Sequence, residues 1–243
     1  MANLIIDIGN TALKAACADG ITLGKTFRYQ GERMIDFILS ITEKNKPETM
    51  ILSSVRHFSA QSMERLRKEC DNLVIVDEQM LAEYNLPLYL TPDRAASIIA
   101  ARYLFKGKGC SLFDLGTTLT MDFLDKEGNF LGGMISPGCR TRFKALNRYT
   151  KTLPLVDTPD EVVETGMSVQ SSVSSGVVTG IMFEMKGYMD RYADNVNVFT
   201  GGDAIYFAKR MKNSIFVVCN LVLMGLALIA VEHSAGESGS QQA

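Results

Sequence analysis

The sequence predicts an α/β protein made of two similar halves, each with a mixed sheet and flanking helices. The first observation is a repeated pattern: an apolar run is followed by Asp7-Ile8-Gly9-Asn10-Thr11 and again by Asp114-Leu115-Gly116-Thr117-Thr118. A shift of 107 residues aligns Asp7 with Asp114, Gly9 with Gly116 and Thr11 with Thr118. The second observation is that strands and helices alternate after each opening meander of strands. An internal repeat followed by such alternation is typical of a duplicated α/β architecture.

The composition is that of a globular protein with a sizeable core. The chain has 243 residues, of which 47% are hydrophobic and 21% are charged. The net charge is −2 and the sequence has no basic stripe, which argues against a nucleic-acid partner. The five cysteines lack CxxC spacing, which argues against a metal cluster or a disulfide framework and fits reduced, cytoplasmic thiols. We expect no secretory signal at the N-terminus.

The first half is predicted to open with strands at 3–7, 11–18 and 22–29, followed by a helix at 31–45. Further elements are a strand at 50–55, a helix at 59–70, a strand at 72–76, a loop at 77–92 and a helix that ends near 105. Gly24-Lys25-Thr26 resembles the end of a P-loop, but the required earlier glycine is replaced by Asp19 and no helix follows. We therefore reject a P-loop.

The second half is predicted to begin at Cys110 and to repeat the strand meander. Its third strand ends in the glycine-rich segment 132–138, and a helix with a basic, solvated face follows at 139–148. A long helix is expected at 166–192 and a strand at 197–199, which ends in Thr200-Gly201-Gly202-Asp203. Helices are expected at 204–211 and 221–232. The apolar stretch 215–231 is shorter than the ~20 residues of a membrane span, which favours a buried helix.

We expect the first half to occupy residues 1–108 and the second half residues 109–234. Residues 235–243 are small and polar, and this composition predicts a disordered tail.

The repeated Asp-x-Gly turn suits phosphate binding. The strand brings a carboxylate to its end, and the glycine lets the backbone approach a ligand closely. Backbone N–H groups in such a turn form an anion-binding concavity, while the carboxylate holds a magnesium ion that bridges to the phosphates. An ordinary hairpin turn is the alternative for one copy alone. Two copies after similar strands favour a nucleoside triphosphate bound from both sides.

Asp93 has two interpretations that the sequence leaves open. Thr91 suits the N-cap of a helix, Pro92 its first position, and an acid in the first turn complements the helix dipole. The same carboxylate suits a general base.

His57 and His233 have no partner in the sequence that suggests a Ser/His/Asp or Cys/His catalytic arrangement.

The order of the motifs resembles that of the type III pantothenate kinases over nearly the whole chain. The motifs are Asp-x-Gly-Asn-Thr, an Asp-Arg pair, Asp-x-Gly-Thr, Gly-Gly-x-Ile-x-Pro-Gly and a late Thr-Gly-Gly-Asp. This family belongs to the superfamily of acetate and sugar kinases, heat-shock 70 proteins and actin. The resemblance implies that each half has actin-like ATPase (ribonuclease H-like) topology. It also implies phosphorylation of pantothenate by ATP to 4'-phosphopantothenate, the first step of coenzyme A synthesis, by a cytoplasmic homodimer.

The resemblance also implies a role for each residue of the site. Asp93 is the general base, Arg94 orients the substrate, and Asp114 binds potassium or ammonium. Asp7 helps to hold Mg²⁺, either directly or through its water shell. The ATP-binding residues are Asp7, Ile8, Gly9, Asn10, Thr11, Ala12, Leu13, Lys14 and Thr117. The pantothenate-binding residues are Tyr84, Thr91, Pro92, Asp93, Arg94 and Val169; Pro87 also fits the family pattern.

Two departures from the family pattern lie on the pantothenate side. Thr91-Pro92 replaces the Gly-x that precedes Asp-Arg in the family, and Val169 occupies the position of a threonine that contacts pantothenate. Ser168 is a candidate to replace that threonine if the helix is rotated. Two rival functions therefore stay open: a kinase of the same fold for another small hydroxy acid, and a non-catalytic nucleotide-binding regulator.

Overall fold

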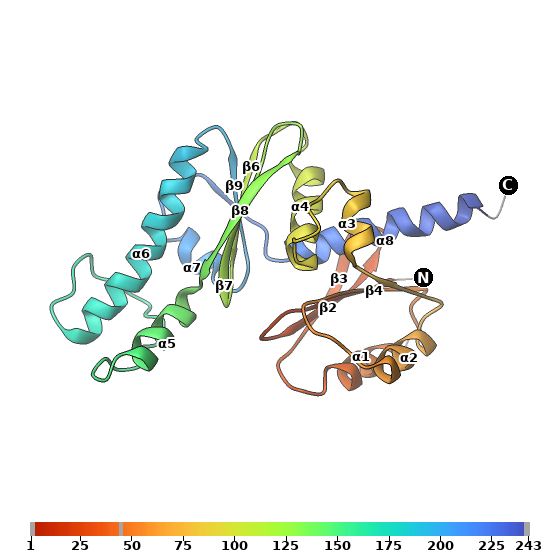
Figure 1. Cartoon of the computed structure of the whole chain (residues 1–243), viewed down its shortest axis with the longest axis horizontal. Helices are drawn as coiled ribbons and strands as arrows, with labels where there is room; N and C mark the ends of the chain where they lie inside the picture. The colour runs from red at the N-terminus through yellow and green to blue at the C-terminus, as the bar shows by residue number, and fades with distance from the viewer. Residues whose placement is uncertain (1–2, 44–45, 241–243) are drawn as a thin grey trace. The chain divides into compact units, whose positions relative to one another are not determined.

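A computed structural model describes residues 3–43 and 46–240, and its chain divides into two compact units (Figure 1). Unit 1 comprises the residues up to Leu104 together with those from Asn220 onward. Unit 2 comprises Phe105–Cys219. Each unit contains one five-stranded sheet, and each is described by itself below.

Unit 1 is built on a mixed sheet with the strand order β3-β2-β1-β4-β5. β1 pairs antiparallel with β2 and parallel with β4, β2 pairs antiparallel with β3, and β4 pairs parallel with β5. The strands are β1 (Asn3–Ile8), β2 (Leu13–Asp19), β3 (Thr22–Tyr29), β4 (Thr49–Ser54) and β5 (Asn72–Ile75). The helices are α1 (Met34–Thr42), α2 (Ala60–Lys68), α3 (Glu78–Glu83), α4 (Pro92–Leu104) and α8 (Leu221–Ser240).

The alternation of side chains along β1 directs Asp7 to a particular face of this sheet. Leu4, Ile6 and Ile8 pack in one core cluster with Ile38 of α1 and Leu66 of α2. Because successive side chains of a strand point to opposite faces, Asp7 lies on the other face. In Figure 1, α1 and α2 lie on one side of the sheet, and α4 and α8 lie on the other. Asp7 therefore shares its face with α4 and α8.

The association of α8 with unit 1 corrects the expected division of the chain. We predicted that 109–234 would form the second half, but α8 packs against α4 and against the strands of unit 1. A Cβ atom on Gly225 would lie 1.8 Å from the Ala96 carbonyl oxygen, so the two helix backbones touch at this crossing. The apolar surface of α8 is thus buried by a sheet from the other end of the sequence, which local pattern does not reveal.

The helix α8 also extends beyond its predicted end. It continues to Ser240, where we predicted a disordered tail from 235, and residues 241–243 lie outside the described residues. Within the described ranges, no helix combines the length and the apolar character needed to cross a membrane.

Unit 2 repeats the strand order of unit 1 as β8-β7-β6-β9-β10. β6 corresponds to β1, and it again pairs antiparallel with one neighbour and parallel with the other. The strands are β6 (Cys110–Leu115), β7 (Thr118–Leu124), β8 (Phe130–Pro137), β9 (Val196–Thr200) and β10 (Ile215–Val217). The helices are α5 (Cys139–Tyr149), α6 (Val169–Arg191) and α7 (Ala204–Ala208). The predicted duplication is therefore confirmed at the level of topology.

Two short elements differ from the prediction for physical reasons. The predicted loop 77–92 contains α3, which is capped because the Asp77 side chain accepts a hydrogen bond from the Met80 N–H over 3.0 Å. Met80 and Leu81 are buried, so tertiary packing stabilises a helix of six residues. The stretch 215–231, predicted as one helix, begins with the edge strand β10, which pairs parallel with β9. Three apolar residues do not distinguish a strand from a helix.

Candidate active site

The first Asp-x-Gly turn joins β1 and β2 and holds a buried carboxylate. The Gly9 N–H donates to the Ala12 carbonyl over 3.1 Å and closes the turn. Asp7 is only 8% exposed and lies opposite Ser53 of the parallel strand β4. The Ser53 hydroxyl donates to Asp7 Oδ1 over 3.2 Å. Asp7 is thus oriented by a residue 46 positions later in the chain, a partner that sequence reasoning did not identify.

The second turn joins β6 and β7 and is also closed by a backbone hydrogen bond from its glycine. The Gly116 N–H donates to the Thr118 carbonyl over 3.0 Å, and Asp114 lies opposite Thr200 of the parallel strand β9. Thr200 is buried and occupies the place that Ser53 has beside Asp7. Each aspartate therefore has a hydroxyl-bearing residue across the parallel pair.

One detail of the predicted repeat is wrong. Four residues separate the paired Ile8 and Leu13, whereas three separate the paired Leu115 and Leu119. The second hairpin is therefore one residue shorter. As a result Thr118, which the sequence aligned with Thr11, takes the structural place of Ala12 as the acceptor of the glycine N–H.

The glycines around the turns fall into two groups. A Cβ atom on Gly9 would lie 3.5 Å from the Ala12 carbonyl oxygen, and one on Gly116 would lie 3.8 Å from the Thr118 carbonyl oxygen, so the fold has room for both. A Cβ atom on Gly138 would instead lie 2.0 Å from the Gly116 carbonyl oxygen. One on Gly201, whose φ is +92°, would lie 2.4 Å from Asp114 Oδ1. Gly138 and Gly201 are needed by the fold itself, whereas Gly9 and Gly116 leave space at the two turns.

Two distant segments of unit 2 contact the second turn through hydrogen bonds to its backbone carbonyls. The Gly138 N–H donates to the Thr117 carbonyl over 3.1 Å, and the Thr141 hydroxyl donates to the same carbonyl over 2.6 Å. From the other side, the Asp203 N–H donates to the Leu115 carbonyl over 2.9 Å. The glycine-rich segments that we singled out at 132–138 and 200–203 therefore meet at the second turn.

Asp203 adds a carboxyl group in an unusual environment beside this turn. It occupies the N-cap position of α7, but its side chain makes no capping hydrogen bond. Burial raises the pKa of the Asp203 carboxyl above its usual value. A desolvated carboxylate without a cap contact is costly for the fold, and this cost marks the segment as a functional candidate.

Asp93 lies where both of its interpretations require it, in the first turn of α4. The helix begins at Pro92, and the Ala95 N–H donates to the Thr91 carbonyl over 3.0 Å. Asp93 is half-buried, and its carboxylate accepts a hydrogen bond from the Arg94 N–H over 2.9 Å. Arg94 itself is buried. The position is compatible with a helix-dipole contact and with a base whose carboxylate is partly accessible.

Tyr84 lies at the C-cap of α3, and both its backbone and its side chain have partners. Arg102 of α4 donates to the Tyr84 carbonyl over 2.7 Å, and the Tyr84 hydroxyl donates to the Glu232 carboxylate of α8. Burial, and next the Glu232 hydrogen bond, raise the pKa of the Tyr84 hydroxyl. The hydroxyl therefore stays protonated. The sequence contained no signal for Glu232, which lies 148 residues further along the chain.

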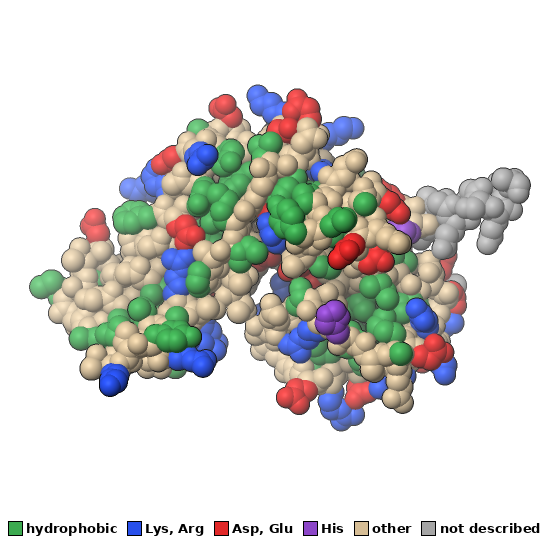
Figure 2. Space-filling view, viewed as in Figure 1, with side chains coloured by type: hydrophobic (Ala, Val, Ile, Leu, Met, Phe, Trp, Pro, Cys, Tyr) green, Lys and Arg blue, Asp and Glu red, His purple; other side chains and the backbone are tan. Residues whose placement is uncertain are grey.

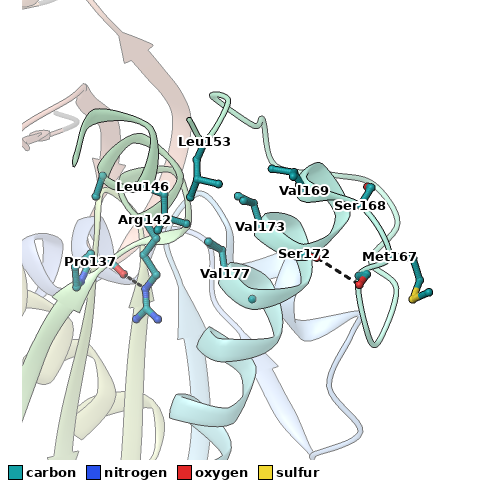
Figure 3. A pocket seen from close by; sticks show the side chains of 13 residues that line it. Pro137, Arg142, Leu146, Leu153, Met167, Ser168, Val169, Ser172, Val173 and Val177 are labelled. Carbon is teal, nitrogen blue, oxygen red and sulfur yellow. Dashed lines mark hydrogen bonds between the residues drawn. The ribbon is translucent and has the colours of Figure 1, made fainter. Parts of the chain in front are cut away.

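Val169 is the first residue of α6 and lines an apolar pocket of about 960 Å³ between α5, α6 and the end of β8 (Figure 3). Val169 is 57% exposed. Ser168 is the N-cap of α6, where its side chain accepts a hydrogen bond from the Ser171 N–H over 3.1 Å. That hydroxyl is therefore engaged in capping the helix. The polar group Arg142 lies at the pocket edge, where its Nε donates to the Pro137 carbonyl over 2.8 Å.

Charged side chains of both signs are interspersed on the face shown in Figure 2. In the part of the chain that the structure describes, no group of three or more His, Cys, Asp or Glu side chains is placed to hold a metal ion.

Comparison with known proteins shows which family the sequence matches. A family model described as type III pantothenate kinase matches residues 3–191. A type III pantothenate kinase from Cytophaga hutchinsonii is 39% identical over 235 residues, which cover 92% of this chain and 96% of that protein.

Two solved structures show the same fold at low sequence identity. One is the activator of the 2-hydroxyisocaproyl-CoA dehydratase from Clostridium difficile with bound ADPNP (TM-score 0.60, 13% identity, 99% of this chain and 98% of that chain). The other is the ROK hexokinase from Thermus thermophilus (TM-score 0.54, 12% identity, 94% and 98%). The predicted actin-like ATPase topology is thereby confirmed.

Proposed function

The chain belongs to the type III pantothenate kinase family, and from this premise we propose that it transfers the γ-phosphoryl group of ATP to the primary hydroxyl of pantothenate. The product is 4'-phosphopantothenate, so the reaction is the first step of coenzyme A synthesis. The observation that carries the proposal is the pair of Asp-x-Gly turns at equivalent strand ends. Phosphoryl transfer depends mainly on positioning and charge neutralisation, which two such turns can supply.

The ATP phosphates are proposed to bind along 7–14, with a further contact from Thr117. The absence of a side chain at Gly9 supports this assignment, because a glycine lets a ligand approach the backbone closely, and a Cβ atom there would lie 3.5 Å from the nearest protein atom beyond its chain neighbours. The turn N–H groups are suitable donors to phosphate oxygens. Lys14 lies opposite Asp7 in the β1–β2 pair, which places a cationic residue on the same hairpin.

The residues present fit the two cations that the family implies. Mg²⁺ prefers one or two carboxylates together with phosphate oxygens and water, and the Asp7 carboxylate is already oriented by Ser53. Asp114 Oδ1 and the Leu115 carbonyl oxygen both lie beside Gly201, since a Cβ atom there would come within 2.5 Å of each, so two oxygen ligands converge at this point. We assign Asp7 to magnesium, either directly or through a bound water, and Asp114 to potassium or ammonium. When bound, these cations neutralise phosphate charge.

The acceptor alcohol is proposed to lose its proton to Asp93. The half-buried Asp93 carboxylate has one contact to the Arg94 N–H, and a base must be within hydrogen-bond reach of the proton that it accepts. Arg94 orients the substrate, while Thr91, Pro92, Tyr84 and Val169 contribute to the pantothenate side. The Tyr84 hydroxyl donates its hydrogen to Glu232, and its oxygen can still accept a hydrogen bond from the substrate.

We also propose a homodimer that is completed at the pocket beside Val169. Val169, Met167 and Phe183 expose large apolar side chains on or next to α6. Exposed apolar surface of this kind is typical of an interface.

The five cysteines are free, which supports a reducing compartment such as the cytoplasm. The proposed homodimer is tested separately, by light scattering of the purified protein, which measures its oligomeric state.

One assay tests the proposed reaction against its rivals. ADP release is measured with and without pantothenate, and the phosphorylated product is identified by mass spectrometry. ADP release that depends on another hydroxy acid alone would assign a different substrate, a possibility that the Thr91 and Val169 departures raise. Nucleotide binding without turnover on any acceptor would indicate a regulator.

The same assay on Asp93→Asn separates the base from a helix-capping residue. As a general base, Asp93 should contribute about 10²–10⁴-fold to the rate, whereas a dipole contact is worth only about 0.3–1 kcal/mol of stability. We expect turnover to fall at least about a hundredfold with near-normal ATP binding. A mutant with near wild-type turnover would leave Asp93 as a helix-start residue.

A further inference from the structure

We propose that Arg56 is an additional nucleotide-binding residue, whose guanidinium contacts the phosphates of ATP at the first turn. The inference deepens the proposed function and rests on it. No pattern in the sequence connects Arg56 with this turn, which is formed 46 residues earlier in the chain.

Arg56 is held beside the turn by the end of β4. The Val55 N–H donates to the Ile8 carbonyl over 3.1 Å, so the β1–β4 pairing continues past the last residue of β4. The Ser54 hydroxyl then accepts from the Arg56 N–H over 3.0 Å and donates to the Arg56 carbonyl over 2.9 Å. The backbone at Arg56 is therefore fixed relative to the strand that carries Asp7.

The side chain of Arg56 reaches the tip of the turn. Its Nη2 donates to the carbonyl of Asn10, an exposed residue of the stretch proposed to bind phosphate. A guanidinium has five N–H donors, and this contact uses one of them. Among the residues that the structure describes, no carboxylate is paired with Arg56. The remaining donors and the full charge are available to a ligand.

The positive charge of Arg56 can offset the repulsion between the Asp7 carboxylate and a bound triphosphate. Asp7 is buried directly before the turn, so a triphosphate that approaches meets a negative charge as well as N–H donors. A guanidinium can bridge a backbone carbonyl and phosphate oxygens at once, because its donors lie in one plane at fixed angles. Arg56 is exposed, so its attraction to phosphate should be screened by salt. A contact that only shapes the turn would lack this salt dependence.

The experiment measures nucleotide affinity by calorimetry for the wild type and three variants of the full chain. Arg56→Gln removes the charge and retains a donor for the Asn10 carbonyl, while Arg56→Lys keeps the charge and loses the planar fork. Arg67→Gln is the matched control, because Arg67 is an exposed arginine on α2 and its replacement makes the same change in net charge. ATP, ADP and AMP are each titrated at low and high ionic strength.

We expect Arg56→Gln to weaken ATP binding about tenfold at low salt, with a smaller effect for ADP and little for AMP. Arg56→Lys should be intermediate, Arg67→Gln should match the wild type, and the deficit should shrink at high salt. Wild-type ATP affinity in Arg56→Gln would overturn the inference. An equal, salt-independent loss for all three nucleotides would also overturn it, because it would assign Arg56 to the shape of the turn. If either overturning result appears while the wild type phosphorylates pantothenate, only the inference about Arg56 fails. A wild type that binds no ATP contradicts the proposed function as well.

Discussion

Alanine substitution at Gly9 tests whether the first turn brings its backbone to a phosphate. The structure accepts the new Cβ atom, which would lie 3.5 Å from the Ala12 carbonyl oxygen in ordinary van der Waals contact. The unfolded chain loses freedom when glycine becomes alanine, which stabilises a compatible site by about 0.4–1 kcal/mol. We therefore expect a melting temperature unchanged or raised by about 1–4 °C.

The same methyl group should interfere with ATP. It would occupy the space through which phosphate oxygens approach the turn N–H groups, and a hydrogen bond to a charged group is worth about 1.5–3 kcal/mol. ATP affinity of Gly9→Ala should then fall by about tenfold to a hundredfold. Calorimetry with a non-hydrolysable ATP analogue measures this change, and a thermal melt establishes that the variant is folded.

Gly201→Ala is the matched comparison, because the fold itself excludes a side chain there. The Cβ atom would lie 2.4 Å from Asp114 Oδ1 and 2.5 Å from the Leu115 carbonyl oxygen, at a φ of +92°. Backbone strain of about 1–2 kcal/mol and overpacking of about 1–3 kcal/mol should lower the melting temperature by about 4–20 °C. A folded Gly9→Ala variant with wild-type ATP affinity would refute the phosphate-turn argument.

The remaining predictions concern four other positions. Val169→Thr restores a hydroxyl at the pantothenate side and should lower the KM for pantothenate several-fold without changing that for ATP; an unchanged KM would show that the position does not contact the substrate. Replacement of potassium by sodium should slow the reaction if Asp114 binds a monovalent cation, and an unchanged rate would remove that role. Glu232→Gln should raise the KM for pantothenate, measured beside a thermal melt, because Tyr84 loses its charged acceptor; an unchanged KM would separate Tyr84 from the substrate. Burial raises the folded-state pKa of Asp203, so this group favours the folded state most below its unfolded pKa of about 3.9, and the favourable contribution is lost as pH rises through the folded pKa. The Asp203→Asn variant should therefore have a higher melting temperature than the wild type at pH 7 and the same melting temperature near pH 3. The same difference in melting temperature at both pH values would contradict this reasoning.

The longer elements could be predicted because their signals are local. The strands at the start of each half have apolar runs that end at Asp-x-Gly, and the order of motifs identified the family that the comparisons confirm. The short elements α3 and β10 escaped prediction because their stability comes from a cap and from a neighbouring strand rather than from periodicity.

The candidate site was predictable only in part. The sequence singled out Asp7, Asp93 and Asp114 by their positions at strand and helix ends, and their roles stay predictions. It contained no sign of Ser53 beside Asp7 or of Glu232 beside Tyr84, because both contacts depend on which distant segments pack together.

The sequence by itself determined the duplication, the two turns and the family, since each depends on residues close together in the chain or on the order of motifs. The tertiary structure alone decided that α8 completes unit 1 and that the backbones at Gly138 and Gly201 enclose the second turn. It also distinguished glycines that the fold requires from Gly9 and Gly116, where a side chain would fit. The physical reason is that a close contact between backbones depends on the register and packing of segments far apart in the chain, which no local pattern encodes.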